Sequence, residues 1–295
     1  MISIIIPTHN RLKMLKRAIY SVENQTFKNY EIIIISDGST DGTNDYLCSI
    51  KNEKIKFHIN ESSKGASGAR NIGLEHAKGD YIAFLDDDDE WFENHLELLF
   101  KKLSNSNDKV GLVYGWIDYY ENNKLIKSKH PKLSGNIFIE MLDKQAITNS
   151  SVLMIKKHVL KKVIGFNEKL LRGNDGDFIR RISKFYHVDF VPAVLCKVHV
   201  GHDDRITLNT PKNLKNEIDS YLKRLEFFEK DLEKYKLQKS NINFKISISY
   251  LKLGNILYSL KFLSIAVKLT EFKIISFLHL KTYAKHVLIK LFAWN

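Results

Sequence analysis

The chain has 295 residues, 44% hydrophobic and 27% charged, a composition typical of a soluble globular protein with one large domain or a domain and an appendage. Its two cysteines exclude a disulfide framework, and a formal net charge of +12 indicates an anionic partner. No apolar run reaches the ~18 residues of a membrane span, and the start, MISIIIPTHNR, lacks the basic region of a signal peptide. A cytoplasmic location is the simplest expectation.

The first hundred residues alternate apolar runs with segments of helical spacing. Strands are predicted at 3–7, 31–36, 54–59 and 81–85, and helices at 12–22, 44–50 and 66–79, the last closed by Gly79. This alternation predicts βαβ units and a mostly parallel sheet that is buried on both faces. In such sheets ligands bind beyond the carboxyl ends of the strands, where SDGSTDG and DDDD fall.

Beyond residue 105 the pattern is less regular. Strands are predicted at 109–116, 150–155 and 187–200, the last interrupted by Pro192, and helices at 177–185 and 211–236. Residues 242–250 alternate as a strand does, but the context of 251–269 favours helices with a break at Gly254-Asn255. The last 56 residues contain eight lysines and one acid, hence +7 of the +12. We therefore predict two regions, residues 1–210 and a basic, mainly helical region at 211–295.

Four adjacent aspartates end the apolar run YIAFL at residues 81–85. At about 4 Å each like-charge pair costs roughly 4 kcal/mol near a protein surface, so such a cluster indicates a bound cation. In extended backbone Asp86 and Asp88 share a side and can face one ligand. Asp89 and Glu90 are also explained by a solvated loop that caps a helix starting near Trp91. An EF-hand is excluded, because Trp91 stands where its loop needs glycine.

Four further segments carry polar side chains with both a structural and a functional explanation. In SDGSTDGT (36–43), Asp37 either belongs to a turn or accepts hydrogen bonds from a nucleobase edge. In KGASGARNIG (64–73), which is not a P-loop, Arg70 either binds a phosphate or forms an ordinary salt bridge. Asp175, in RGNDGDFIRR, taken alone is better explained as a helix cap. His199 and His202 are weak indications of a metal site.

Together IIIPTHNR, SDGSTDGT, GASGARNIG and YIAFLDDDDEW resemble the family-2 glycosyltransferases, which are inverting enzymes of GT-A fold. The match in order and spacing covers residues 1–100 and continues more weakly through SSVLMI, GFNEKLLRGND and VHVGHDDRIT to about residue 205. The resemblance implies an α/β fold, with a mostly parallel central sheet flanked by helices. It also implies transfer of a sugar from a nucleotide-diphosphate sugar to an acceptor, with UDP as a family-level expectation.

The resemblance assigns five residues to the nucleotide. Pro7, Thr8 and Asn10 fall where the first strand of the family contacts the nucleoside, and Asp37 falls where a carboxylate binds the base. Arg70 matches the arginine of the glycine-rich helix start near the nucleotide.

The metal site is implied in the same way. Asp86, Asp87 and Asp88 match the DxD motif, with Asp86 and Asp87 toward the ribose and the metal, and Asp88 as the principal ligand of Mn²⁺ or Mg²⁺. His199 or His202 falls near the place where some members have a further ligand to the metal or diphosphate. The sequence does not distinguish between these two histidines.

Asp175 matches the general base of the family, although Asn174 replaces the glutamate that usually precedes it. A diphosphate leaving group builds up negative charge, which a divalent cation stabilises as a Lewis acid. The attacking hydroxyl has to lose its proton, and a carboxylate within hydrogen-bond reach suffices as the base. The pair Asp88 and Asp175 therefore meets both requirements.

Three rival functions are weaker. A sugar-phosphate nucleotidyltransferase needs a glycine-rich loop after the first strand, which PTHNRLKM lacks. An inactive nucleotide-sugar-binding or scaffold protein is left open by Asn174, but intact Asp88 and Asp175 argue against it. Nucleic-acid binding has no recognisable motif here, and we expect no nucleic-acid partner.

The lysines of the C-terminal region have two explanations that we weigh equally. Lys261 and Lys268 share one face of a helix among apolar residues, as binding to an anionic membrane surface requires. A packed helical subdomain with a solvated lysine face explains the same pattern. The first explanation predicts a peripheral location on the inner face of the cell membrane. It also suits a lipid-linked saccharide acceptor in the synthesis of surface polysaccharide.

Overall fold

The protein is described by a computed structural model that covers residues 1–144, 146–147, 149–201, 210–270 and 274–292. The chain divides into two compact units. The first comprises Met1–Phe138, Gln145–Lys169 and Asn174–Asp203, and the second comprises Ile139–Lys144, Leu170–Gly173 and Asp204–Asn295. Because two short segments from the first 210 residues cluster with the second unit, the boundary at residue 210 stays a prediction.

The described part of the first unit is built on one sheet of nine strands. The strand order is β3-β2-β1-β4-β8-β6-β9-β5, with β7 paired to β6. The strands are β1 Ile2–Thr8, β2 Tyr30–Asp37, β3 Ile55–Asn60, β4 Tyr81–Phe84, β5 Asp89–Trp91, β6 Val110–Glu121, β7 Lys124–Lys129, β8 Leu153–Lys156 and β9 His187–Val200. The pairs among β1 to β4 are parallel, while β8 is antiparallel to both β4 and β6.

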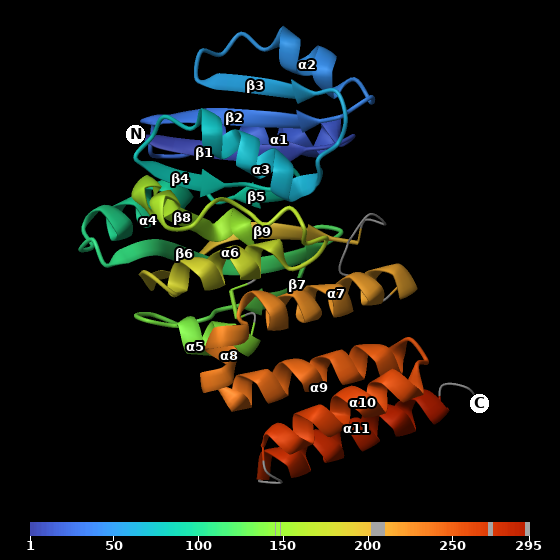
Figure 1. Ribbon diagram of the computed structural model, residues 1–295. Helices are drawn as coiled ribbons and strands as arrows, with labels where there is room; N and C mark the ends of the chain where they lie inside the picture. The colour runs from blue at the N-terminus through green and yellow to red at the C-terminus, as the bar shows by residue number, and fades with distance from the viewer. Residues whose placement is uncertain (145, 148, 202–209, 271–273, 293–295) are drawn as a thin grey trace. The chain divides into compact units, whose positions relative to one another are not determined.

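Helices cover this sheet on both faces (Figure 1). They are α1 Leu12–Glu23, α2 Thr43–Ser49, α3 Gly65–His76, α4 His95–Ser104 and α6 Asn174–Ser183. Helix α5, Phe138–Asp143, starts in this unit with Phe138 only. Every residue of β1 and β2 is buried, as expected for central strands with helices on either side. Gly73 of α3 packs directly on β1, since a Cβ there would lie 2.4 Å from Ile5 Cγ2. The predicted α/β fold with a mostly parallel sheet is confirmed.

Several predicted boundaries are wrong. The helix predicted near Trp91 begins at His95, because Trp91 belongs to β5, which pairs with β9. Helix α3 ends at His76, so Gly79 does not close it; a Cβ at Gly79 would lie 2.7 Å from the carbonyl oxygen of Met1. The strand predicted at 150–155 starts as a 3₁₀ turn at Ser150–Val152, and only Leu153–Lys156 is a strand. These differences matter because two of them lie beside the aspartates.

The described part of the second unit is helical. Its helices are the remainder of α5, then α7 Pro211–Phe227, α8 Glu229–Lys234, α9 Lys236–Lys252, α10 Ile256–Leu269 and α11 Ile274–Phe292. Helices are thus confirmed for 242–250 and 251–269, with the break at Gly254-Asn255, and the strand alternative is wrong. A small core joins the last three helices through Leu251, Leu263, Val267 and Tyr283. None of the described helices is long and apolar enough to cross a membrane.

Candidate active site

The aspartate segment is a turn, whereas the sequence analysis paired Asp86 with Asp88 on the basis of extended backbone. The backbone N–H of Asp89 donates to the carbonyl oxygen of Asp86 over 3.0 Å, which reverses the chain after β4. This turn brings one carboxylate oxygen from each of Asp86, Asp88 and Asp89 within 4.8 Å of one another. The expected pairing of Asp86 with Asp88 is therefore found, but Asp89 joins them and a different backbone geometry produces it.

Asp89 is not the solvated loop residue that the sequence allowed. Its side chain is 2% exposed and accepts hydrogen bonds from Ser151 Oγ at 2.6 Å and Asn149 Nδ2 at 2.9 Å. Burial, together with the charges of Asp88 and Asp86, raises the pKa of Asp89 well above its usual value. The cluster thus concentrates three carboxyl groups of like charge, which a cation would stabilise.

Asp87 binds the end of β1 instead of joining its neighbours. Its carboxylate accepts from Thr8 Oγ1 at 2.7 Å and from Arg11 Nη1 at 3.1 Å. The same Arg11 nitrogen lies 3.3 Å from Asp88 Oδ2. Burial raises the pKa of Asp87 to about 6, although Thr8 and Arg11 oppose that shift. Thr8 and Asp87 therefore meet at the predicted site, and Arg11 is a member that the sequence analysis missed.

Arg70 connects the aspartate cluster to Asp175. The guanidinium is buried and lies over the ring of Phe166, with 5.1 Å between Cζ and the ring centroid. It donates to Asp86 Oδ1 at 2.5 Å, and its other terminal nitrogen is 3.9 Å from Asp175 Oδ1. Asp86, Asp175 and Asp88 all raise its pKa against the effect of burial. One side chain thus contacts two acids that are far from it in the sequence: Asp86 is 16 positions after Arg70, and Asp175 is 105 positions after it.

Asp175 lies in the first turn of α6 and is mostly buried. Burial and the charge of Asp86 raise its pKa to about 6, against the lowering effects of Arg70 and of hydrogen bonds from Ser150. Asn174, beside it, donates from Nδ2 to Ser67 Oγ at 2.5 Å, while its buried Oδ1 has no hydrogen-bond partner in the part of the chain that the structure describes. A carboxyl group that titrates near neutrality can accept a proton, as catalysis by a general base requires.

The carboxylate of Asp37, at the end of β2, accepts hydrogen bonds from residues at the start of α3 and just before it. Its carboxylate accepts from Asn60 Nδ2, Ser63 Oγ and the backbone N–H groups of Lys64 and Gly65, at 2.7 to 3.0 Å. Burial alone would raise the pKa of Asp37, but these hydrogen bonds outweigh it and lower the pKa. The structure thus shows Asp37 tying β2 to α3, and its contact with a base stays a prediction.

The loop after β1 lies against the loop after β2. Asn10 has a positive φ of 54°, and its Oδ1 accepts from the backbone N–H of Thr40 at 2.6 Å. Its own backbone N–H donates to Ser39 Oγ at 3.1 Å. Pro7 is buried in β1 opposite Ile35 of β2. The predicted nucleoside contacts are therefore brought to one edge of the sheet, in and directly after the last residues of β1 and β2.

His199 lies beside the cluster but binds another acid. Its Nε2 is 3.3 Å from Glu90 Oε2, and Lys197 Nζ is 3.0 Å from the other oxygen of Glu90. Burial and the charge of Arg17 lower the pKa of His199, against Glu90. His202 lies outside the residues that the structure describes. The role of either histidine toward a metal stays a prediction.

Asn149, Ser150 and Ser151 form a support for the acids that the sequence analysis did not identify. Ser151 Oγ accepts from the backbone N–H of Asp86 at 3.0 Å and donates to Asp89. Ser150 Oγ is 3.3 Å from Asp86 Oδ1 and also bonds Asp175. The interpretation of 150–155 as a strand concealed these contacts, because a strand would point the two serines to opposite faces.

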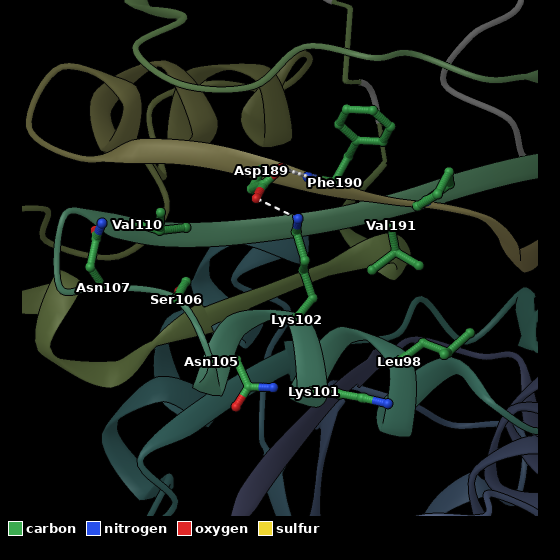
Figure 2. A pocket seen from close by; sticks show the side chains of 11 residues that line it. Leu98, Lys101, Lys102, Asn105, Ser106, Asn107, Val110, Asp189, Phe190 and Val191 are labelled. Carbon is green, nitrogen blue, oxygen red and sulfur yellow. Dashed lines mark hydrogen bonds and ion pairs between the residues drawn. The ribbon is translucent and has the colours of Figure 1, made fainter.

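A pocket of about 620 Å³ lies elsewhere on the same unit. It is formed by the end of α4 and the starts of β6 and β9, and Lys102 in it pairs with Asp189 at 2.7 Å (Figure 2). Because β6 runs parallel to β4, this pocket is at the sheet edge opposite the aspartates. It contains none of the predicted site residues.

The family model described as Glycosyl transferase family 2 matches residues 3–163, which is more than half of the chain and includes the aspartate turn, Arg70 and the support at 149–151. The chain is a family 2 glycosyltransferase. The resemblance inferred from the sequence is confirmed, and with it the enzyme class. The rival hypotheses of a nucleotidyltransferase or an inactive scaffold are not supported by this family match.

Relatives of this glycosyltransferase differ greatly in length. The uncharacterized glycosyltransferase RC0461 of Rickettsia conorii is 36% identical over 52% of this chain, and the match spans only 25% of that protein. The GalNAc(5)-diNAcBac-PP-undecaprenol beta-1,3-glucosyltransferase of Campylobacter jejuni is 30% identical over 91% of this chain and 89% of its own length.

Solved structures show the fold of the enzyme. TarS 1-349 of S. aureus in complex with UDP-GlcNAc superposes with a TM-score of 0.63 and 16% identity, over 92% of this chain and 83% of that one. The mannosyltransferase PcManGT from Pyrobaculum calidifontis, in complex with GDP-Man and Mn²⁺, has a TM-score of 0.61 and 16% identity, over 97% and 80%. The glycosyltransferase therefore has the GT-A fold.

Proposed function

We propose that this glycosyltransferase is metal-dependent and inverting, and that it transfers a sugar from a UDP-sugar to a lipid-linked saccharide during surface polysaccharide synthesis. The observation that carries the proposal is the connection of two acidic sites by one buried arginine. Arg70 contacts Asp86 of the three-carboxylate cluster on one side and Asp175 on the other. In a displacement reaction the site that binds the sugar donor and the base that deprotonates the acceptor have to lie close together.

The cluster suits Mn²⁺ or Mg²⁺. Its donors are carboxylate oxygens from Asp86, Asp88 and Asp89, the ligands that hard divalent cations prefer, and they are too few to form a complete cage. Asp88 and Asp86 would hold such a cation, which would supply Lewis-acid stabilisation of the diphosphate leaving group. The raised pKa of Asp89 supports the same assignment, since burial and the charges of Asp88 and Asp86 disfavour its ionised form and a cation would offset both effects.

Asp175 is the general base in this proposal. Its pKa of about 6 leaves the carboxylate ionised at neutral pH and still basic enough to accept the proton of a hydroxyl in the transition state. Arg70 holds the carboxylate in place through its charge, while the hydrogen bonds from Ser150 restrict its orientation. The replacement at Asn174 leaves this function intact, because the amide bonds Ser67 and not Asp175.

The nucleotide is assigned to the loops after β1 and β2, with Pro7, Thr8, Asn10 and Asp37 as its contacts and Arg70 near its phosphates. UDP is supported by the complex of TarS with UDP-GlcNAc, whereas the complex of PcManGT with GDP-Man names the competing nucleotide. A lipid-linked acceptor is supported by the relative from C. jejuni, whose name specifies a diphospho-undecaprenol saccharide. A peripheral location on the inner face of the membrane follows from such an acceptor.

Calorimetric titration of UDP and GDP into the full-length chain, with and without Mn²⁺, tests the proposal. We expect UDP to bind in the presence of Mn²⁺ and the binding to be lost in Asp88→Ala. The matched control is Asp108→Ala, since Asp108 is fully exposed and outside the site. Tight binding of UDP that is indifferent to Mn²⁺ and to Asp88→Ala would contradict metal dependence, and binding of GDP alone would replace UDP as the nucleotide.

A further inference from the structure

We propose that the first turns of α10 dock the enzyme on an anionic lipid bilayer. The surface concerned, here called the α10 patch, consists of Ile256, Leu257, Tyr258 and Leu260. The inference rests on the proposed function only in that a lipid-linked acceptor requires the enzyme to reach a membrane. It names which part of the chain makes the contact, and its partner is the lipid surface itself.

The α10 patch consists of large, mainly apolar side chains that are nevertheless exposed to solvent. The exposed fractions are 61% for Ile256, 77% for Leu257, 45% for Tyr258 and 50% for Leu260. Single exposed apolar residues are ordinary, but four large ones within five positions form a contiguous surface that marks an interaction site.

The core of the second unit does not need this patch. The opposite face of α10 is already packed, with Leu263 and Ala266 buried and Ser259 fully covered. Ser259 and Ser247 of α9 exchange hydrogen bonds to each other's carbonyl oxygens at 2.8 Å, which fixes the side of α10 that faces α9. Ile256, Leu257 and Leu260 therefore lie away from this packed side, while the ring of Tyr258 is 5.2 Å from the ring of Tyr250 of α9.

The patch lies at the turn that joins α9 to α10. Residues 253–255 reverse the chain between α9 and α10 with Gly254 at a φ of 86°, and Figure 1 shows α9, α10 and α11 side by side. Tyr283 of α11 reaches this end, because its hydroxyl is 2.9 Å from Ser259 Oγ. Exposed apolar side chains at such a turn can enter the headgroup region of a bilayer.

Lysines flank the apolar residues in the sequence. Lys252 and Lys261, which precede and follow the patch along the chain, are both exposed, and Lys261 Nζ is 5.8 Å from the centroid of the Tyr258 ring. The last 56 residues carry a net charge of +7. Apolar residues with a basic rim match a bilayer that contains anionic lipid, in which the lysines meet headgroups while the apolar side chains enter the acyl boundary. A second copy of the chain would bring like charges together, which disfavours self-association at this surface.

Sedimentation of the full-length chain with phosphatidylcholine vesicles, with and without phosphatidylglycerol, tests the proposal. We expect binding to the anionic vesicles that weakens as salt is added. Leu257→Asp should weaken this binding at least tenfold, because it removes the most exposed apolar side chain of the patch and adds a negative charge. Ile164→Asp is the matched control, since Ile164 is 91% exposed and lies in the other unit. Lys261→Gln should weaken binding about fivefold, and Lys230→Gln on α8 should not.

Two results overturn the proposal: no sedimentation of the wild-type chain with anionic vesicles, or equal binding by wild type and Leu257→Asp. If instead light scattering shows an oligomer that Leu257→Asp dissociates, the patch is an interface between copies and the lipid assignment is wrong. Titration of UDP with Mn²⁺ into Leu257→Asp separates this inference from the proposed function. Unchanged nucleotide binding alongside lost vesicle binding supports the docking surface, whatever the fate of the donor assignment.

Discussion

The two units of the chain differ in how they use charge. In the first unit Asp87 and Arg70 are buried charged residues with defined partners. Asp87 accepts a hydrogen bond from Thr8, and Arg70 donates one to Asp86. In the second unit the lysines are numerous and many are exposed, as Lys252 and Lys261 are. Chemistry at an anomeric carbon depends on positions fixed within a fraction of an ångström, whereas attraction to a surface depends mainly on the amount of charge.

The same contrast holds for apolar residues. The strands β1 and β2 bury every side chain between helices, so that the loops beyond them are held in one place. On α10, by contrast, Leu263 is 7% exposed and Leu257 is 77% exposed, within two turns of one helix. The first unit therefore uses its apolar residues to position a site, and the second divides them between a core and a surface.

The largest effect that sharpens this contrast is expected from Asp175→Asn. The variant removes the general base, so the transfer rate should fall about 10²–10⁴-fold while UDP binding with Mn²⁺ remains. In the wild type the rate should rise with pH up to about 6 and then level off, because Asp175 is protonated and inactive below its raised pKa. Steady-state kinetics across pH, with calorimetry at one pH, measure both.

The rise of the rate up to pH 6, here called the acidic limb, has to be assigned to one residue, because Asp87 also has a pKa raised to about 6. If Asp175 is the base, the residual activity of Asp175→Asn loses the limb altogether. The control Asp118→Asn changes an acid of β6 that bonds Ser128 and should keep both the rate and the limb. A residual rate that still rises through pH 6 in Asp175→Asn would assign the limb to another group and remove Asp175 from its proposed role.

A stability comparison within α10 is the next test. Leu263→Ala should lower the free energy of unfolding by about 2–5 kcal/mol, because Leu263 belongs to the core that joins α9, α10 and α11. Leu257→Ser should change it by less than about 0.5 kcal/mol, since the side chain lies mostly in water. Urea titrations followed by circular dichroism measure both midpoints. Equal losses for the two variants would mean that Leu257 is covered in solution.

Much of the first unit could be predicted from the sequence. Continuous runs such as SIIIP and EIIIIS can satisfy burial on both faces only as central strands, and the polar residues after them must then lie at one edge of the sheet. This places Asp37 and the four aspartates at the same edge without knowledge of any contact. The meeting of Arg70 with Asp175 could be anticipated only through the family resemblance, because no local pattern relates residues so distant in the chain.

What the sequence did not predict has a physical reason in each case. Asp89 was interpreted as a solvated residue, because local patterns do not show that Ser151 and Asn149 arrive from another part of the sheet to cover it. Strand β5 has three residues and exists through its pairing with β9, so it has no periodicity of its own. The α10 patch was hidden as well, since exposed and buried leucines look alike until the neighbouring helices are placed.

The smallest effect is expected from Ser150→Ala, which tests how the support at 149–151 acts on the base. The hydroxyl of Ser150 lowers the pKa of Asp175, so its removal should move the acidic limb of the rate profile upward from about 6, by about half to one pH unit. Ser151→Ala is the matched control, because Ser151 Oγ bonds Asp89 and the backbone of Asp86 but not Asp175, and its limb should stay in place. Rate profiles of the two variants decide the matter. A limb that moves equally in both, or in neither, would mean that Ser150 supports the fold of the turn and does not tune the base.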